Sequence, residues 1–364
     1  PKDLVARASK LDMPALALTD RDNLAGTIRF VTACKEFGIA PILGVNLSLD
    51  NGRITLLASS NNGWASLARF MTGVSNKKIT LPLLEELSVY TKNLFILHGP
   101  ESLVAKTISA RREPIKEFNK YRKFFADSFI ECVSHLTAEG AKSTFAANQS
   151  YNFAIENDLP VVLTNAVRML QPSDGPVADI LDATRNLVPL TERNVERRNS
   201  EGYLKSDQLM RQLAEEIIHG HGAQLVKNTE RLAQNCVLSP ERDFGLGGIQ
   251  LPDRAESVSE LREQLRIRCE GSLIDRYRTS TELRQAKDRL ADELTTVATL
   301  GYESYFLTVA DVTDMARGAG IRVAARGSGA GSLICHLLGI SGVDPIRYGL
   351  LMERFCSPLR RALP

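Results

Sequence analysis

Residues 326–332, Arg-Gly-Ser-Gly-Ala-Gly-Ser, have the composition of a backbone loop that binds phosphate. Glycines admit unusual backbone angles and leave amide N–H groups uncovered. Such N–H groups, together with the positive end of a following helix, attract phosphate, and Arg326 adds a forked cationic donor. The spacing fits neither the P-loop nor the dinucleotide-binding fingerprint. On this pattern alone, two interpretations stay open: a phosphate site built from Arg326, Gly327 and Ser328, and a tight structural turn.

The segments around the loop predict the elements that would position it. Residues 321–325, Ile-Arg-Val-Ala-Ala, are typical of a strand, and residues 333–340 are typical of an apolar helix. The loop is therefore expected at a strand-to-helix junction. Residues 255–300 upstream are predicted to be helical, because apolar residues recur on one helix face at Leu290, Leu294, Val297 and Leu300.

Composition limits the classes of protein to which the chain can belong. Its 364 residues are enough for two domains. Its net charge of +2 is too small to indicate a nucleic-acid partner. The six cysteines show no CxxC pair and no zinc spacing, so they are predicted to be reduced, buried thiols of a cytoplasmic protein. No apolar run is long enough to span a membrane, so no membrane partner is expected. The opening Pro1 indicates a trimmed sequence, and we expect trimming at both ends.

The first part of the chain alternates short apolar strands with helices, which predicts an α/β fold. Short connections between them favour parallel strands in an α/β barrel or sheet. Residues 173–236 are predicted to be mainly helical, and 243–252, rich in glycine, are the expected linker. Earlier helices are expected at 24–36, 63–72 and 138–156, and strands at 15–19, 40–47, 54–58, 94–97, 128–132 and 160–164.

Three further segments place the glycine loop in a known context: 301–311 (GYESYFLTVAD), 339–345 (GISGVDP) and 350–355 (LLMERF). In order and spacing they resemble the palm of the bacterial C-family DNA polymerases, which are the alpha subunits of DNA polymerase III and their error-prone relatives. The resemblance implies that the loop holds the triphosphate of the incoming nucleotide, with Arg354 nearby. A structural ion pair of Arg354 with Glu353 or Asp344 is the alternative. In the family, a catalytic Asp-x-Asp follows a proline at this place, so the segment ending at Pro364 is expected to be inactive alone.

Residues 14–26 (PALALTDRDNLAG) and 41–46 (PILGVN) resemble the PHP domain that begins C-family polymerases. This second resemblance implies a PHP-type distorted (β/α)7 barrel over residues 1–236, with metal ions at the strand ends in active members. Residues 237–364 would then hold the N-terminal part of a nucleotidyltransferase-like α+β palm, reached through a helical connection and cut before the Asp-x-Asp.

The metal-binding motif implied by the PHP resemblance is degenerate. Arginine replaces histidine in the Thr-Asp-His-Asp motif of active members and at two later positions, and asparagine replaces a glutamate. A guanidinium offers a metal no lone pair. We therefore expect no bound metal and no phosphoesterase or proofreading activity here. The residues at this degenerate site are Asp20, Arg21, Asp22, Asn46, Arg53 and Arg168.

We hypothesise that Arg21, Arg53 and Arg168 replace the metal ions electrostatically and pair with the retained aspartates of the motif. Buried charges of one sign require such partners. The alternative is that some of the three arginines turn to the solvent. Guanidinium groups that lie far apart and have no carboxylate neighbours would contradict the hypothesis. His98 ends a predicted strand and could face the same site, but one histidine makes no metal site.

Together the two resemblances predict the N-terminal segment of a DNA-directed DNA polymerase. The whole polypeptide would use Mg²⁺, a DNA primer-template and deoxynucleoside triphosphates, with a sliding clamp or repair accessory proteins as candidate partners. The arginine form of the PHP motif favours the error-prone, damage-tolerant branch. Two alternatives stay open. One is a non-catalytic PHP scaffold that docks polymerase accessory proteins, and the other is a PHP-type phosphoesterase, against which the lost ligands count.

Overall fold

The computed structural model describes residues 1–74, 80–191, 194–195, 197–246, 248 and 251–358. The chain divides into two compact units, residues 1–247 and 248–364, and each has its own hydrophobic core. The division falls inside the predicted linker, 243–252. The first residues of that linker instead complete a short helix, α11 (Pro240–Phe244).

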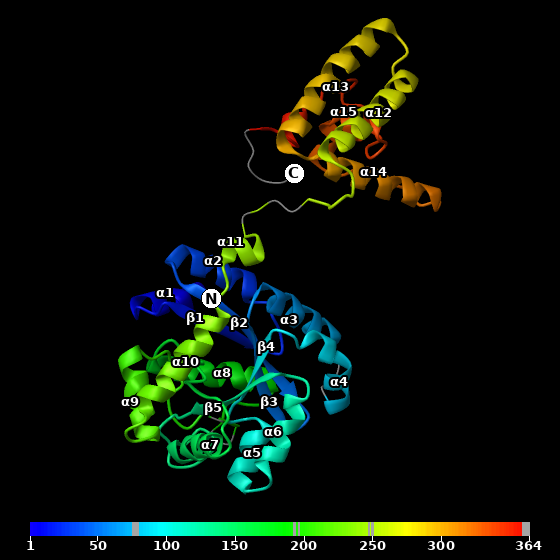
Figure 1. Ribbon diagram of the computed structural model, residues 1–364. Coiled ribbons are helices and arrows are strands. Elements are labelled where there is room, and N and C mark those ends of the chain that lie inside the picture. The colour runs from blue at the N-terminus through cyan, green and yellow to red at the C-terminus, as the bar shows by residue number, and fades with distance from the viewer. Residues whose placement is uncertain (75–79, 192–193, 196, 247, 249–250, 359–364) are drawn as a thin grey trace. The chain divides into compact units, whose positions relative to one another are not determined.

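The first unit is built on one curled six-stranded sheet whose strands lie side by side in sequence order (Figure 1). Apolar residues fill these strands, and Leu43, Leu56 and Ile96 are completely buried. All six predicted strands are confirmed, each within a few residues of its predicted bounds. The strands are β1 (Ala15–Arg21), β2 (Ala40–Leu49), β3 (Gly52–Ala58), β4 (Leu94–His98), β5 (Asp127–Val133) and β6 (Val161–Thr164).

The prediction of parallel strands is wrong for β3, which runs antiparallel to both of its neighbours. Strands β2 and β3 are joined by a two-residue turn, because Leu49 pairs with Gly52. So short a connection can only reverse the chain, whereas parallel strands need a crossover of about a dozen residues or more. Glycine suits position 52, because a Cβ there would lie 2.4 Å from the carbonyl oxygen of Glu101. The short spacing between these two strands was the overlooked signal.

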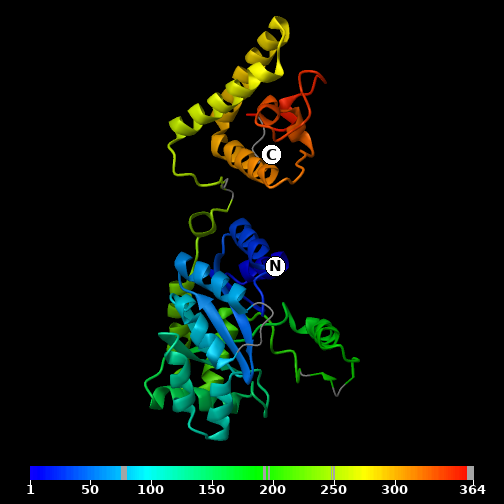
Figure 2. The same ribbon diagram turned by 90° about the vertical axis from the view of Figure 1, so that its right-hand side faces the viewer.

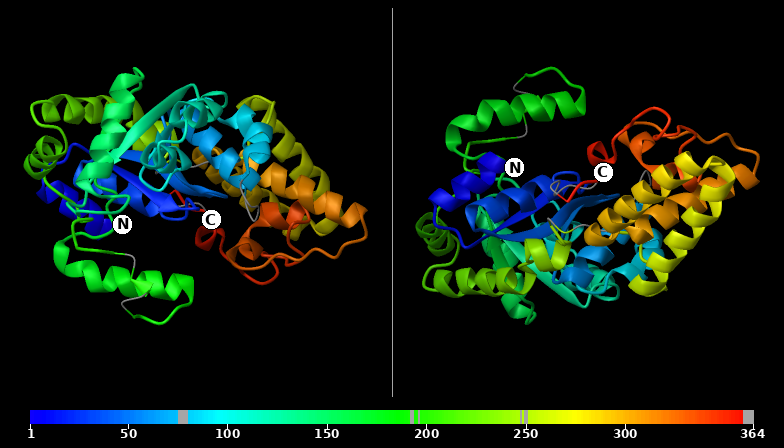
Figure 3. Two further views of the ribbon diagram at one scale, coloured as in Figure 1. Left: turned by 90° about the horizontal axis from the view of Figure 1, so that it is seen from below. Right: turned by 90° about the horizontal axis from the view of Figure 1, so that it is seen from above.

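Helices pack along this sheet and cover its apolar residues (Figure 1). Helix α8 differs from the others, because it stands away from the sheet in Figures 2 and 3 and exposes Val177, Ile180 and Leu181. The helices of the first unit, besides α11, are α1 (Lys2–Lys10), α2 (Thr27–Phe37), α3 (Asn61–Val74), α4 (Leu81–Glu86), α5 (Leu103–Ala110), α6 (Pro114–Arg122), α7 (Thr144–Glu156), α8 (Gly175–Asn186), α9 (Asp207–Ile217) and α10 (Gly222–Cys236).

The regular secondary structure in the described part of the second unit consists of helices. The apolar face predicted for residues 255–300 is confirmed, since Leu290 and Val297 are buried and Leu294 and Leu300 pack against the same core. All six cysteines of the chain are buried, as predicted. None of the helices in the described ranges has the length and apolarity that a membrane crossing requires. The helices of this unit are α12 (Val258–Arg276), α13 (Ser280–Leu300), α14 (Glu303–Gly318) and α15 (Leu333–Leu337).

The strand predicted at residues 321–325 is wrong, because these residues have no regular structure. Ile321 is 60% exposed, and the described residues of this unit contain no strand with which the segment could pair. A strand needs a neighbour to satisfy its backbone N–H and C=O groups. The α+β architecture expected for this unit is therefore not seen in its described residues.

Candidate nucleotide loop and arginine cluster

The glycine loop of the second unit forms a short 3₁₀ turn over Ser328–Gly331. Gly327 precedes the turn with a φ of 85°, a left-handed angle that favours glycine. Gly331 is constrained by space, because a Cβ there would lie 2.5 Å from the carbonyl oxygen of Leu351. The loop therefore packs directly against the segment that leads to Arg354, and two separate stretches of sequence form one surface.

The polar groups of this loop are accessible to a ligand. Arg326, Gly327 and Ser328 are all exposed. In the part of the chain that the structure describes, the side chains of Arg326 and Ser328 make no hydrogen bond, and the N–H groups of 327–329 donate none to the backbone. Uncovered N–H groups beside a guanidinium are a set of donors that suits phosphate oxygens.

The helix that follows the loop does not offer the free N-terminus that the sequence predicted. The N–H groups of Leu333 and Ile334 at the start of α15 donate to the carboxylate of Glu293 over 2.9 and 3.1 Å. The Ser332 hydroxyl donates to the same carboxylate over 2.9 Å. A carboxylate there already satisfies the N–H groups and the partial charge that would attract phosphate. This part of the prediction is wrong, and the candidate anion site is reduced to the loop itself.

Glu293 is a key residue that the sequence analysis missed. It is only 3% exposed, and its Oε1 lies 3.0 Å from Nε of Arg289. Arg289 also donates to the carbonyl oxygen of Gly331 over 2.6 Å, so the pair braces the loop as well as the helix. The signal was available, because position 293 lies between Leu290 and Val297 on the buried face of α13. An acid on an apolar helix face needs a buried partner.

Arg354 ends the 3₁₀ turn Met352–Arg354 and is exposed. Asp344, one of the two acids considered as its structural partner, accepts hydrogen bonds from the Tyr277 hydroxyl over 2.8 Å and from the Ile346 N–H over 2.9 Å. Asp344 therefore has a structural role of its own, in the packing of α12 against the chain after α15. The nucleotide contact of Arg354 stays a prediction.

In the first unit, three of the predicted site residues form one hydrogen-bonded network. The guanidinium of Arg53 donates to Oδ1 of Asn46 over 2.6 Å and lies 3.2 Å from Oδ2 of Asp22. Asp22 also accepts from the backbone N–H and the hydroxyl of Ser48, over 2.6 and 2.8 Å. The sheet brings these residues together, because Arg21 and Asn46 are paired in the register of β1 and β2. Arg53 thus has a retained aspartate as its partner, in agreement with the hypothesis.

Arg168 has a different acid as its partner. Its guanidinium lies 2.7 Å from Oδ1 of Asp182 on α8, and that of Arg185 lies 3.1 Å from the same oxygen. Burial raises the pKa of Asp182, but Arg168, Arg185 and Arg21 outweigh it and hold that pKa below its usual value. The sequence analysis did not consider Asp182 or Arg185, because nothing in the spacing connects α8 with the strand ends.

Arg21 forms an ion pair with neither Asp22 nor Asp182, and Asp20 forms no ion pair with Arg53 or Arg168. Oδ2 of Asp20 faces the turn after β1, where a Cβ on Gly26 would lie 2.5 Å from it. The guanidinium of Arg21 makes no hydrogen bond and no ion pair with any described residue, whereas its backbone carbonyl accepts from Nδ2 of Asn23 over 2.8 Å. Burial and the charges of Arg168, Arg185 and Arg53 lower the pKa of Arg21, whereas Glu101 raises it. The predicted arginines therefore lie within electrostatic range of one another, but only Arg53 pairs with an aspartate of the motif.

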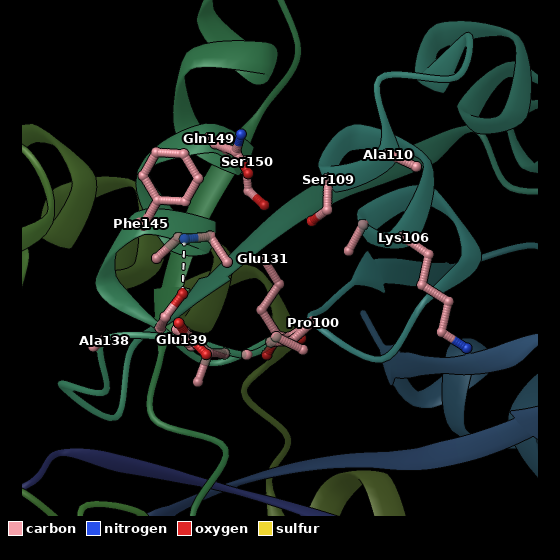
Figure 4. Close-up of a pocket in the computed structure, with 17 residues that line it drawn as sticks. Pro100, Lys106, Ser109, Ala110, Glu131, Ala138, Glu139, Phe145, Gln149 and Ser150 are labelled. Carbon is pink, nitrogen blue, oxygen red and sulfur yellow. Dashed lines mark hydrogen bonds between the residues drawn. The ribbon is translucent and has the colours of Figure 1, made fainter.

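A pocket of about 640 Å³ lies between α5 and α7, and none of the predicted site residues lines it (Figure 4). Glu131 on β5 is drawn at its centre, with Ser109 of α5 on one side and Phe145 of α7 on the other. Oε1 of Glu131 accepts a hydrogen bond from the Thr164 hydroxyl over 2.7 Å, and burial raises the pKa of Glu131. The sequence offered one signal for this residue, a single acid inside an apolar strand.

His98 does not face the site at the strand ends, contrary to one possibility raised by the sequence. It is 1% exposed, and its ring lies 5.1 Å from that of Phe118 and 5.0 Å from that of Tyr121, measured between centroids. Neither ring nitrogen has a hydrogen-bond partner among the described residues.

The carboxylates near the strand ends do not fit a metal ion. Asp22 is engaged by Arg53 and Ser48, and Asp20 faces the turn at Gly26. Across the residues that the structure describes, no group of three or more His, Cys, Asp or Glu side chains could hold a metal. We therefore derive no metal-dependent step for this segment.

Two family models match this chain, and each match falls within a different one of the two units. Residues 1–135 match the model of the PHP domain, and residues 263–364 match that of the bacterial DNA polymerase III alpha NTPase domain. The error-prone DNA polymerase of Symbiobacterium thermophilum is 33% identical over 390 residues, which cover 100% of this chain and 34% of that protein. Over its whole length the chain is therefore similar to a bacterial DNA polymerase.

Further relatives also match this chain over its whole length. The error-prone DNA polymerase of Pseudomonas fluorescens is 30% identical over 370 residues, 100% of this chain and 34% of the relative. The DNA polymerase III subunit alpha of Buchnera aphidicola is 26% identical over 388 residues, 100% of this chain and 33% of the relative. The chain thus spans about a third of the length of the relatives it matches.

The two family models divide the predicted site residues between them. The PHP match contains the aspartates of the motif, Asn46 and Arg53, and the DNA polymerase III alpha NTPase match contains the glycine loop and Arg354. Arg168 and its partner Asp182 lie between the two matched regions.

Proposed function

We propose that this chain is the N-terminal segment of a DNA-directed DNA polymerase and that its glycine loop binds the triphosphate of the incoming nucleotide. The observation that carries the proposal is the loop, where uncovered N–H groups at 327–329 lie beside the exposed guanidinium of Arg326. The hydroxyl of Ser328 adds a donor, and Arg354 lies on the segment packed against the loop. Preorganised donors of this kind neutralise phosphate charge in nucleotidyl transfer.

We further propose that residues 1–236 are a PHP domain in which cationic side chains replace the metal ions. The ion pair between Arg53 and Asp22 supports this proposal. In this proposal the six-stranded sheet is part of a distorted (β/α)7 barrel, and residues 237–364 are the beginning of the polymerase palm. The error-prone branch is our proposed subclass, and the identity to relatives of that name supports it.

The cofactor and partners of the whole polymerase follow from the same proposal. Mg²⁺ would be held by carboxylates outside the described residues of this chain. The substrates would be a DNA primer-template and deoxynucleoside triphosphates, and a sliding clamp or repair accessory proteins would be protein partners. The buried thiols agree with the reducing conditions of the cytoplasm, where we propose that the enzyme acts.

Replacement of Arg326 by alanine tests the nucleotide loop. The variant is made in a polypeptide that joins this chain to the downstream region found in its relatives, and primer extension is measured against deoxynucleotide concentration. A charged hydrogen bond contributes about 1.5–3 kcal/mol, so kcat/KM for the nucleotide should fall at least about tenfold. Ser328→Ala should shift it in the same direction by less.

Arg322→Ala is the matched control, because Arg322 is an exposed arginine four positions before Arg326. Its nucleotide dependence should stay that of the unmodified protein. Equal effects of Arg322→Ala and Arg326→Ala, or no effect of either, would remove the loop from the mechanism.

A further inference from the structure

The pocket of about 640 Å³ between α5 and α7 has the size and the lining of a small-molecule site (Figure 4). Pockets that hold small molecules measure about 300–1,000 Å³ and are mostly apolar, with a few polar groups that converge on the ligand. Alanines form much of this wall, and Ala105, Ala110, Ala146 and Ala147 are examples from the two helices. The polar groups among these alanines should therefore determine which ligand fits.

Glu131 is the charged group at the centre of the pocket. Its Oε1 accepts a hydrogen bond from the Thr164 hydroxyl over 2.7 Å, whereas its Oε2 accepts none, and its carboxylate forms no ion pair with any residue that the structure describes. Gly99 leaves room for Oε2, because a Cβ at position 99 would lie 2.2 Å from it. A carboxylate oxygen withdrawn from bulk water needs a donor, and burial raises the pKa of Glu131 accordingly. A ligand that brings a donor would satisfy this oxygen.

The lysines of this region are engaged by other groups. Lys106 lines the pocket, but Figure 4 shows its side chain turned away from Glu131, and its Nζ donates to the carbonyl oxygen of Asn51 over 2.8 Å. Lys142 pairs with Glu101 over 3.1 Å. The negative charge in the pocket therefore has no cation of its own, which disfavours an anion as the ligand. A neutral apolar molecule would leave the carboxylate oxygen without a donor.

Three further polar side chains line the pocket, Ser109 on α5 and Gln149 and Ser150 on α7. None of these side chains makes a hydrogen bond with a described residue, and their oxygens can accept one. Phe145 is 65% exposed and lies on the opposite side of Glu131 from Ser109, where its ring offers a π-face to a cation. An ammonium group has three N–H donors for these oxygens, and an apolar body attached to it would contact the alanines.

We propose that this pocket binds a primary organic ammonium ion with an apolar body, and that Glu131 holds the ammonium group. The hydroxyls of Ser109 and Ser150 accept its remaining N–H donors, and the ring of Phe145 contacts the cation. None of the residues proposed to replace the metal ions lines this pocket. The inference goes beyond the proposed polymerase function and does not rest on the glycine loop.

The experiment is calorimetric titration of the complete 364-residue chain with phenethylammonium chloride. The chain should bind this cation at least about tenfold more tightly than phenethyl alcohol, because hydrogen bonds between charged groups are stronger than neutral ones. Glu131→Gln keeps an acceptor for Thr164 but removes the charge, so it should weaken binding of the cation at least about tenfold. Glu156→Gln is the matched control, because Glu156 is an exposed acid of α7 that does not line the pocket, and it should leave the affinity unchanged.

A second variant keeps the test decisive if Glu131→Gln fails to fold. Phe145 is exposed, so Phe145→Ala should fold, and loss of the aromatic face should weaken binding of the cation about two- to fivefold. No binding of phenethylammonium, or equal affinities for it and for phenethyl alcohol, would overturn the proposal. An unchanged affinity in folded Glu131→Gln would overturn it as well, and so would an unchanged affinity in Phe145→Ala.

Discussion

His98 shows how burial controls a single titratable residue in this fold. Its ring packs between Phe118 and Tyr121, and burial lowers the pKa of His98 from 6.5 to about 3. Below about pH 6.5, the unfolded chain therefore binds a proton at His98 that the folded chain does not bind. The free energy of unfolding should fall as the pH drops from about 6.5 towards 3, and it should be at its full value above 6.5.

The variant His98→Leu should remove this acid sensitivity. Leucine fills a similar volume and needs no hydrogen-bond partner, so the loss of stability between pH 6.5 and 5 should shrink by roughly 1–2 kcal/mol. Urea unfolding at both pH values measures it. His219→Leu, at an exposed position, is the control and should keep the original slope. The same slope in His98→Leu and in the unmodified chain would contradict the assignment.

At the scale of elements, the junction between the glycine loop and α15 depends on a carboxylate from another helix. Glu293 accepts hydrogen bonds from Leu333, Ile334 and the Ser332 hydroxyl, and it pairs with Arg289. Removing one partner of a buried ion pair leaves the other charge uncompensated, which destabilises by about 3–5 kcal/mol.

Glu293→Ala should therefore lower the thermal midpoint of the helical second unit, followed by circular dichroism at 222 nm. Asp292→Ala is the matched control, because Asp292 is the preceding residue of α13 and is exposed. The control should shift the midpoint little, since exposed substitutions usually change stability by less than about 0.5 kcal/mol. Equal shifts in the two variants would show that Glu293 does not brace the junction.

The elements that could be predicted from the sequence are those that local pattern determines. Apolar runs located all six strands, and helical periodicity identified the buried face of α13 around Leu290 and Val297. The antiparallel course of β3 follows from the two-residue turn between β2 and β3, which the strand pattern by itself does not indicate. The strand expected at residues 321–325 depends on a partner strand, and no pattern within the segment can report whether one is present.

The candidate site was predictable only in part, for a related reason. The degenerate motif led to Arg53 and Asp22, which pair as expected. The partner of Arg168 is Asp182, which comes from a helix that the motif does not include. Likewise, the start of α15 is capped by Glu293, 40 residues earlier in the chain than Leu333. Contacts between distant elements are set by tertiary packing and have no local signature.

At the scale of the whole molecule, the two units have separate cores and carry different parts of the proposed function. The first carries the PHP match and the arginine cluster, and the second carries the polymerase III alpha NTPase match and the glycine loop. The chain represents about a third of the relatives it matches, and the described residues contain no set of ligands for a metal. Two-metal phosphoryl transfer needs such a set, so we expect polymerisation only when the downstream region is joined to this chain.

The central claim is tested most directly by primer extension with Mg²⁺ and all four deoxynucleotides. The polypeptide that joins this chain to the downstream region found in its relatives is compared with the 364-residue chain alone. We predict that the longer polypeptide extends the primer, that the shorter chain does not, and that Arg326→Ala in the longer one requires at least about tenfold more nucleotide. A longer polypeptide that folds, binds primer-template and still adds no nucleotide would contradict the assignment of this chain to a polymerase.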